Sequence, residues 1–203
     1  MAATQKGVWD LQDVRDKQLA SEWDYEAMDP YGLFMWGRNN NGELGINKGY
    51  TPQVSPSPGK IHSASSPTQV SGTNWNNVGN GRGSLTIGVK SDNTLWAWGN
   101  NGDGGLGQNN TTNRSSPTQI GTGTDWKHMG VGENHGVCTK TDGTLWAWGK
   151  NTDGNLGQNN TTTYSSPIQI PGTTWDRAYG GGEACQAIKT DGTLWVWGNN
   201  SYG

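Results

Sequence analysis

The hexapeptide Thr94-Leu-Trp-Ala-Trp-Gly99 occurs three times in this chain with almost the same residues. The other two copies are Thr144-Leu-Trp-Ala-Trp-Gly149 and Thr193-Leu-Trp-Val-Trp-Gly198, and a weaker copy is Gly32-Leu-Phe-Met-Trp-Gly37. The close copies follow one another at intervals of 50 and 49 residues. A fixed period of this length indicates a repeat protein, in which each repeat is one supersecondary unit.

A second marker has the same period. The tripeptide Ser-Ser-Pro recurs every 50 residues, at 65–67, 115–117 and 165–167. Between the weak copy and the first close copy the hexapeptide interval is 12 residues longer, and the extra residues lie within 46–64. We interpret this segment as a proline-rich loop insertion in an otherwise regular array.

Each unit contains four short segments with the alternation that is typical of β-strands. In the best-defined unit these segments are 117–120, 126–129, 136–140 and 144–148. Asp142-Gly143 and Asp191-Gly192 fall between the last two, where a two-residue hairpin turn needs positive φ. Asp92-Asn93 holds the same place with an asparagine, which tolerates that conformation.

The last strand of each unit is apolar on both faces. Trp146 and Trp148 point to one face, and Leu145 and Ala147 point to the other. A strand with two apolar faces lies between neighbouring layers, and face-to-face stacking of four-stranded sheets is what a β-propeller provides. We therefore predict a repeat core made by the hexapeptide tryptophans Trp36, Trp96, Trp98, Trp146, Trp148, Trp195 and Trp197.

The sequence resembles the regulator-of-chromosome-condensation repeat family over about residues 31–203. The matching stretches are Trp98-Gly-Asn-Asn-Gly-Asp-Gly-Gly-Leu-Gly107 and Trp148-Gly-Lys-Asn-Thr-Asp-Gly-Asn-Leu-Gly157, with Lys140-Thr-Asp-Gly-Thr-Leu145 and Gly132-Glu-Asn-His135 before the second. The resemblance implies an all-β protein with about four blades of a seven-bladed type of propeller, partial or truncated after Gly203. The expected repeats are roughly 31–64, 65–114, 115–164 and 165–203.

Residues 1–30 carry no repeat motif and form a separate N-terminal segment in this interpretation. Asp10 can cap a short helix over 11–20. Trp9, Leu11 and Val14 are the candidate anchor residues. The stretch Lys6-Gly-Val-Trp-Asp-Leu-Gln-Asp-Val-Arg15 resembles the starts of structural proteins from tailed bacteriophages, which implies attachment to a virion.

Composition argues against several classes of partner. The net charge is −3, and the basic residues are scattered singly, whereas a nucleic-acid binder gathers them into a patch. The chain has no apolar run that could span a bilayer and no hydrophobic signal-peptide core near its start. Cys138 and Cys185 are too few for a zinc framework, and we expect them to be buried.

No catalytic, metal or cofactor site is predicted. The three histidines, His62, His128 and His135, accompany no nucleophile or paired-carboxylate motif, and we expect His135 to be a packing residue. Asn101–Gly104 could suggest calcium, but it lacks the spacing of a calcium loop and fits a turn. The recurring Asp92, Asp142 and Asp191 are interpreted as hairpin residues.

The polar segments 109–112 and 159–162 fall at equivalent places in successive units, which is typical of recognition loops on a rigid scaffold. Arg114 and Tyr164, at the position that differs most between copies, are the candidate partner contacts. Simple solubility is the plainer role for both residues.

Three functions are compared. The preferred hypothesis is a non-catalytic virion display protein (a tail fibre, spike or capsid-surface component) in an oligomeric assembly. Its partners would be other virion proteins, through residues 1–30, and a host-surface receptor or glycan. The alternative is a cellular protein-binding propeller, cytoplasmic because it has no signal peptide, and possibly of the guanine-nucleotide exchange type. The third, an enzyme acting on surface polysaccharide, lacks a dedicated carboxylate pair.

Overall fold

The computed structural model describes residues 32–47 and 63–201, and this part of the chain contains thirteen β-strands and no helix. The strands are β1 (Phe34–Arg38), β2 (Ser63–Gln69), β3 (Trp75–Asn80), β4 (Leu85–Lys90), β5 (Leu95–Gly99), β6 (Arg114–Gln119), β7 (Trp126–Val131), β8 (His135–Lys140), β9 (Leu145–Gly149), β10 (Tyr164–Ile170), β11 (Trp175–Gly180), β12 (Ala184–Lys189) and β13 (Leu194–Gly198). The predicted all-β class is confirmed.

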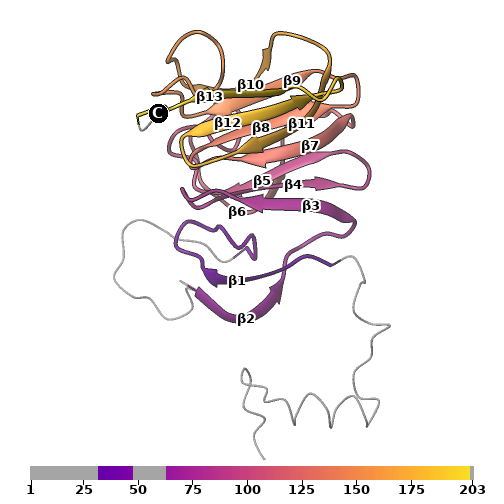
Figure 1. Ribbon diagram of the computed structural model, residues 1–203. Coiled ribbons are helices and arrows are strands. Elements are labelled where there is room, and N and C mark those ends of the chain that lie inside the picture. The colour runs from indigo at the N-terminus through magenta and orange to yellow at the C-terminus, as the bar shows by residue number, and fades with distance from the viewer. Residues whose placement is uncertain (1–31, 48–62, 202–203) are drawn as a thin grey trace, which may run out of the picture.

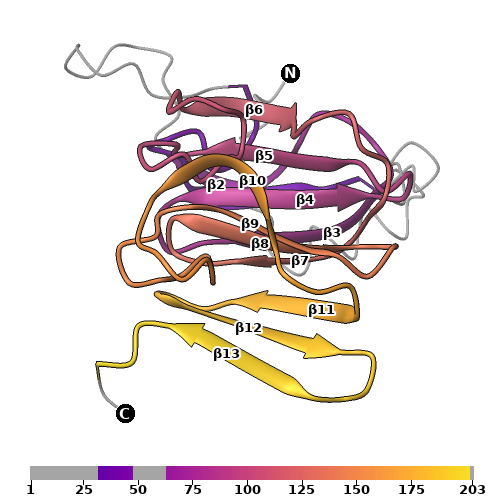
Figure 2. The ribbon, with the colours of Figure 1, turned by 90° about the horizontal axis from the view of Figure 1, so that it is seen from above.

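The strands form four antiparallel sheets that lie on one another as successive layers (Figures 1 and 2). The first sheet has the two strands β1 and β2. Two four-stranded sheets follow, β3-β4-β5-β6 and β7-β8-β9-β10, and then the three-stranded sheet β11-β12-β13. Apolar side chains from neighbouring sheets share one hydrophobic cluster: Leu85 and Ile87 on β4 pack together with Trp148 on β9. The core therefore runs between sheets, as stacking predicts.

The sheets and the sequence repeats do not share boundaries. β6, which carries the Ser-Ser-Pro motif at 115–117, pairs with β5 of the preceding hexapeptide and not with β7. The complete sheets therefore run from Trp75 to Gln119 and from Trp126 to Ile170, so repeats that start at 65, 115 and 165 each combine strands of two sheets. The strand after each hexapeptide thus completes the sheet of that hexapeptide by hydrogen-bonding to its open edge.

The hairpins that join β4 to β5, β8 to β9 and β12 to β13 form as the sequence predicts. Gly143 has a φ of 80°, Gly192 has 84°, and Asn93 has 60° at the same place. The preceding aspartate completes each turn: Asp142 Oδ1 accepts hydrogen bonds from the Thr144 backbone N–H and hydroxyl, at 2.9 and 2.7 Å. The Thr144 hydroxyl in turn accepts from Trp146 Nε1 at 2.9 Å. The hairpin thus orients the first tryptophan of the hexapeptide.

The second tryptophan of each hexapeptide joins its sheet to the preceding one. Trp148 is fully buried, and its Nε1 donates to the Gly105 carbonyl of the previous sheet's loop at 2.9 Å. Trp98 and Trp197 make the same bond to the carbonyls of Glu43 (3.0 Å) and Asn155 (2.8 Å). Each contact therefore uses a buried aromatic ring and one directional hydrogen bond.

This contact requires the glycine that follows the loop leucine. Gly107 has a φ of 67°, and a Cβ at this position would lie 2.8 Å from Trp148 Nε1. Gly45 stands in the same relation to Trp98, with a separation of 2.7 Å. The Leu-Gly motif is thus explained by both a left-handed backbone and the closeness of the next sheet's indole.

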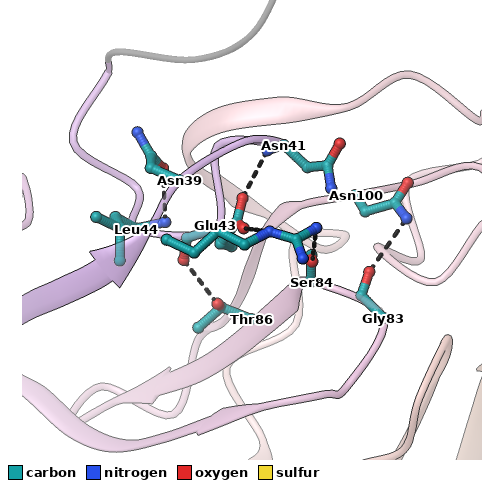
Figure 3. A network of polar contacts seen from close by, with 9 residues as sticks. Asn39, Asn41, Glu43, Leu44, Gly83, Ser84, Thr86 and Asn100 are labelled. Atoms are coloured by element: carbon teal, nitrogen blue, oxygen red, sulfur yellow. Dashed lines mark hydrogen bonds and ion pairs between the residues drawn. The ribbon is translucent and has the colours of Figure 1, made fainter. Parts of the chain in front are cut away.

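A buried asparagine holds each of these loops in shape. Figure 3 shows the first loop, where Asn39 Oδ1 accepts from the Leu44 N–H at 3.0 Å and the Glu43 carbonyl accepts from the Thr86 hydroxyl at 2.9 Å. In the second loop Asn101 Oδ1 accepts from the Leu106 N–H at 2.9 Å. The loops are therefore rigid parts of the stack.

Two of the tryptophans predicted to lie in the core, Trp36 and Trp195, are exposed in the structure. Trp36 is 63% exposed, because among the described residues β1 pairs only with β2; its ring lines a shallow pocket of about 310 Å³ that reaches β3. Trp195 is 49% exposed, because among residues 32–47 and 63–201 no strand pairs with the free edge of β13 and no sheet covers it. Trp96, Trp146 and Trp197 are half-buried.

Several sequence predictions fall outside the described residues. They are the helix over 11–20, the anchor residues Trp9, Leu11 and Val14, the histidine His62, and most of the insertion within 46–64. The division of the chain into residues 1–30 and 31–203 also stays a prediction. Among the described residues, no helix has the length and apolar character that crossing a membrane needs.

The tryptophan contact predicts the cost of substituting Gly107. In Gly107→Ala the new methyl group displaces the Trp148 indole from its acceptor, in addition to straining a left-handed backbone. We expect the strain to cost about 1–2 kcal/mol and the buried, unpaired indole N–H to add about 1–3 kcal/mol. Urea unfolding followed by tryptophan fluorescence measures the total loss.

Gly154→Ala is the matched control. Gly154 has a similar φ of 76°, but a Cβ there would meet nothing within 4 Å. It should therefore show the backbone strain alone. Equal losses of stability in the two variants would contradict the role of the indole contact.

Candidate binding site between two sheets

A surface pocket of about 540 Å³ lies between β6 and β10, the outer strands of the two complete sheets. Loop and corner residues that follow β5 and β6 close its ends. Its lining includes Gln108, Arg114, Trp126 and Lys140. Arg114, predicted from sequence as a partner contact, therefore lies in a defined pocket.

Arg114 is held at one end of the pocket by the preceding loop. Its Nε donates to Gln108 Oε1 at 3.1 Å. The Gln108 amide is itself anchored, because its Nε2 donates to the carbonyls of Thr118 at 3.2 Å and Ala97 at 3.4 Å. The guanidinium is therefore oriented in advance, which lowers the entropy that a bound anion would cost.

Trp126 and Lys140 form the other end of the pocket. Lys140 Nζ lies 4.7 Å from the Trp126 ring centroid and 4.9 Å from that of Trp146, in cation–π geometry. It also forms an ion pair with Asp125 Oδ2 at 3.2 Å. Trp126 contacts Trp146 and Trp148 edge to face, and it is 4% exposed, so its ring is not open to solvent.

The structure does not bring Tyr164 to this pocket. Tyr164 begins β10 and packs against the next cluster, beside Ile168 and Trp197. The two candidate contacts thus occupy equivalent places in successive sheets but have different surroundings. A role for either in partner binding stays a prediction.

The polar segments 109–112 and 159–162, which we call the polar rim, are fixed by the buried asparagines described above. Asn101 Nδ2 donates to the carbonyls of Asn110 and Thr112, at 2.9 and 3.1 Å. Asn151 makes the same two bonds in the next loop, at 2.9 Å each. In addition, the Asn109 N–H donates to the Ser165 carbonyl of the neighbouring sheet at 2.8 Å. The rim is therefore a rigid surface that continues across sheets.

The groups weighed for metal or catalytic chemistry serve the fold. The side chain of Asn101 is used within its own loop, as a turn requires, and Asp92, Asp142 and Asp191 each bind the threonine two residues later. The hydrogen bond from that threonine hydroxyl is the main cause that lowers the pKa of these carboxyl groups. No cluster of three potential metal ligands occurs within the described part of the chain.

His135 is buried between two sheets. Its Nε2 lies 3.1 Å from Cys185 Sγ on β12. Burial lowers the pKa of His135 to about 4, and the nearby Lys150 acts in the same direction. Burial also raises the pKa of Cys185 to about 12. Both groups are therefore neutral at pH 7.

The sequence analysis missed one recurring group in these sheets. Trp75, Trp126 and Trp175 recur at intervals of 51 and 49 residues, and Lys90, Lys140 and Lys189 recur at 50 and 49. In each sheet the lysine lies over this tryptophan and over the first tryptophan of the hexapeptide. Their common period was the available signal, although the hexapeptide alone does not contain it.

Comparison with protein-family models supports the repeat type. Residues 92–139 and 142–181 match the model described as "Regulator of chromosome condensation (RCC1) repeat", and residues 126–155 match a second model of that description. This part of the chain consists of RCC1 repeats. A comparison with curated protein sequences finds no match.

Solved structures of RCC1-type proteins have the same fold. Human WBSCR16 is similar with 21% identity and a TM-score of 0.70, over 84% of this chain and 43% of that one. Prp20p from Saccharomyces cerevisiae is similar with 19% identity and a TM-score of 0.69, over 86% and 43%. Yeast RCC1 (Prp20) in complex with Kap60 gives 16% identity and 0.66, over 83% and 40%. The chain thus spans about two fifths of the length of these RCC1-type structures.

The RCC1 repeat contact at His135 predicts a pH dependence of stability. Because the folded-state pKa of about 4 lies below the usual value of 6.5, the unfolded chain binds more protons between these values. The stabilisation is therefore complete above pH 6.5 and is lost as the pH falls to about 4. Between pH 7 and pH 5 we expect His135 to account for a loss of about 2 kcal/mol.

His135→Gln removes the titrating group, so the variant should lose less stability than the wild type over this interval. Urea unfolding at pH 7, 6 and 5 measures the difference. His128→Gln is the control, because it also removes a histidine, but from a half-buried position. An unchanged pH slope in His135→Gln would refute the assignment.

Proposed function

We propose that this chain is a protein-binding scaffold without catalytic activity. The proposal rests on the polar rim: the same loop is fixed by the same buried asparagine in two successive sheets, and the first loop is tied to β10 of the next sheet through the Asn109–Ser165 bond. A rigid surface with exposed amides and hydroxyls loses little entropy when it binds a second protein.

Two of the solved structures that resemble this chain are of a protein with reported protein partners. One solved structure shows Prp20 bound to Kap60, and another is reported with binding properties of Prp20p to Gsp1p and histones. Since identity to this chain is below 20%, these names suggest the kind of partner, a protein, and not which one.

Finer versions of this function depend on other residues. Display on a bacteriophage virion, with a host receptor or glycan as target, rests on the sequence of residues 6–15, and no comparison supports it. Guanine-nucleotide exchange would need a specialised insertion, and most of the segment within 46–64 lies outside the described residues. The general scaffold is therefore preferred, and its location in a virion or a cytoplasm stays a prediction.

The polar rim can be tested by site-specific photo-crosslinking in an extract of the source organism. A benzoylphenylalanine residue replaces Thr111 or Thr161, both exposed in the rim, and Thr141, exposed beside the β8–β9 hairpin, is the control at the opposite end of the sheet. We expect one discrete protein adduct from the two rim positions and none from the control. Mass spectrometry identifies the adduct and decides between virion and cellular partners.

No adduct from either rim position, or equal adducts from all three, would exclude the polar rim as the binding surface. Urea unfolding of each labelled protein verifies that the fold is intact. Because Thr111 and Thr161 are exposed, the label should disturb the fold little.

A further inference from the structure

One buried hydrogen-bond donor in the wall of the pocket between β6 and β10 has no partner. Trp126 is only 4% exposed, and its Nε1 makes no hydrogen bond. The equivalent Trp75 donates to the Gly72 carbonyl at 3.1 Å, and Trp175 donates to the Pro171 carbonyl at 3.2 Å. A buried, unpaired N–H is costly, so an acceptor is expected at this place.

The cause is an extra residue in the corner before Trp126. Five residues separate Ile120 from Trp126, whereas four separate Val70 from Trp75 and Ile170 from Trp175. The longer corner carries its carbonyls away from the indole. Its glycines, Gly121 and Gly123, line the pocket instead.

Lys140 lies near this donor, Arg114 lies at the other end of the pocket, and the lining residues include no acidic one. A Cβ built on Gly123 would lie 2.9 Å from Asp125 Oδ1, 3.5 Å from Trp126 Nε1 and 3.9 Å from Lys140 Nζ, so the indole donor, the ammonium and one carboxylate oxygen border the same space. Asp125 Oδ1 is also buried and makes no hydrogen bond. Asp125 neutralises Lys140 in part through Oδ2. Arg114 forms no ion pair with any described residue, and its guanidinium contributes a full positive charge.

The combination is specific to this junction. At the place of Arg114 the preceding sheet has Ala64 and the following sheet has Tyr164, and at the place of Gln108 the first loop has Ile46. The same framework therefore carries an anion-binding group at one junction and lacks it at the others. A feature that the fold itself required would recur in each sheet.

From this geometry we propose that the pocket binds an acidic, extended segment of a protein partner, with a backbone carbonyl of the segment at Trp126 Nε1 and a carboxylate at Arg114. Arg114 begins β6, and Trp126 follows the corner at its far end. Because β6 is bulged, Arg114 and Gln119 lie opposite Gly99 and Trp96, about 10 Å apart at roughly 3.3 Å per residue. A single terminal carboxylate cannot span that distance, but one extended segment can.

An acidic glycan fits less well. Sugar rings need an exposed aromatic face, whereas Trp126 is 4% exposed and its ring is not open to solvent. The indole offers its N–H alone. The amides of Asn109 and Gln119 along the pocket suit the backbone of a peptide. This proposal rests on the scaffold function and names the chemistry of its partner.

The probe is fluorescein-labelled acetyl-pentaglutamate amide, added to the full chain and followed by fluorescence anisotropy. Arg114→Ala should weaken its binding about tenfold, and the fold should tolerate this change because alanine stands at the equivalent position 64. Arg177→Ala is the control of equal charge: Arg177 is 59% exposed on β11 and lies outside the pocket. It should leave the affinity unchanged.

A second readout locates the peptide. In protein with ¹⁵N-labelled tryptophan, the indole signal of Trp126, assigned with Trp126→Phe, should shift on binding while those of Trp75 and Trp175 stay in place. No binding, an equal loss in Arg114→Ala and Arg177→Ala, or a shift absent from Trp126 would overturn the proposal. So would tighter binding of trigalacturonate, or of a pentaglutamine peptide with a free C-terminal carboxylate.

These outcomes are separate from the test of the polar rim. If crosslinks form at Thr111 and the acidic peptide fails to bind, the scaffold function stands and the acidic-segment proposal falls. If neither occurs, both are excluded.

Discussion

The stack depends on one hydrogen bond between neighbouring sheets, from the second tryptophan of each hexapeptide to a loop carbonyl of the preceding sheet. A buried indole needs an acceptor for its N–H, and the acceptor must lie at one fixed place. The loop that supplies it needs a buried asparagine to hold its shape and a glycine to leave room for the ring. Three conserved-looking features of the repeat thus follow from a single contact.

Much of this arrangement is predictable from the sequence, because the same strand and turn residues recur in each repeat. Period, strand alternation and the Asp-Gly hairpins predict layered antiparallel sheets correctly. The residue at which each sheet begins is not predictable in this way, because a repeating sequence does not mark where one unit ends. Only the hydrogen bonds show that β6 belongs to the sheet of β5. The exposure of Trp36 and Trp195 also depends on which neighbours surround a strand, and identical motifs cannot reveal that.

The pocket illustrates what departures from a repeat can show. Arg114 drew notice because it differs between copies, and the structure places it in a pocket. Tyr164 differs at the same position and packs against apolar neighbours instead. The unpaired Trp126 donor arises from one additional residue in a corner, and this becomes meaningful only when the hydrogen bonds of Trp75 and Trp175 are known.

Because each sheet of the described part contacts only its neighbours in the stack, its resistance to opening depends on how many sides are covered. The sheet β11-β12-β13 is covered on one side, and Leu194 and Val196 are 61% exposed. Amide hydrogens of β12 and β13 should therefore exchange with solvent sooner than those of β4 and β8, in local fluctuations that leave the middle of the stack closed. Within the described residues the array then behaves as a series of layers whose outer sheets open before the two complete sheets between them.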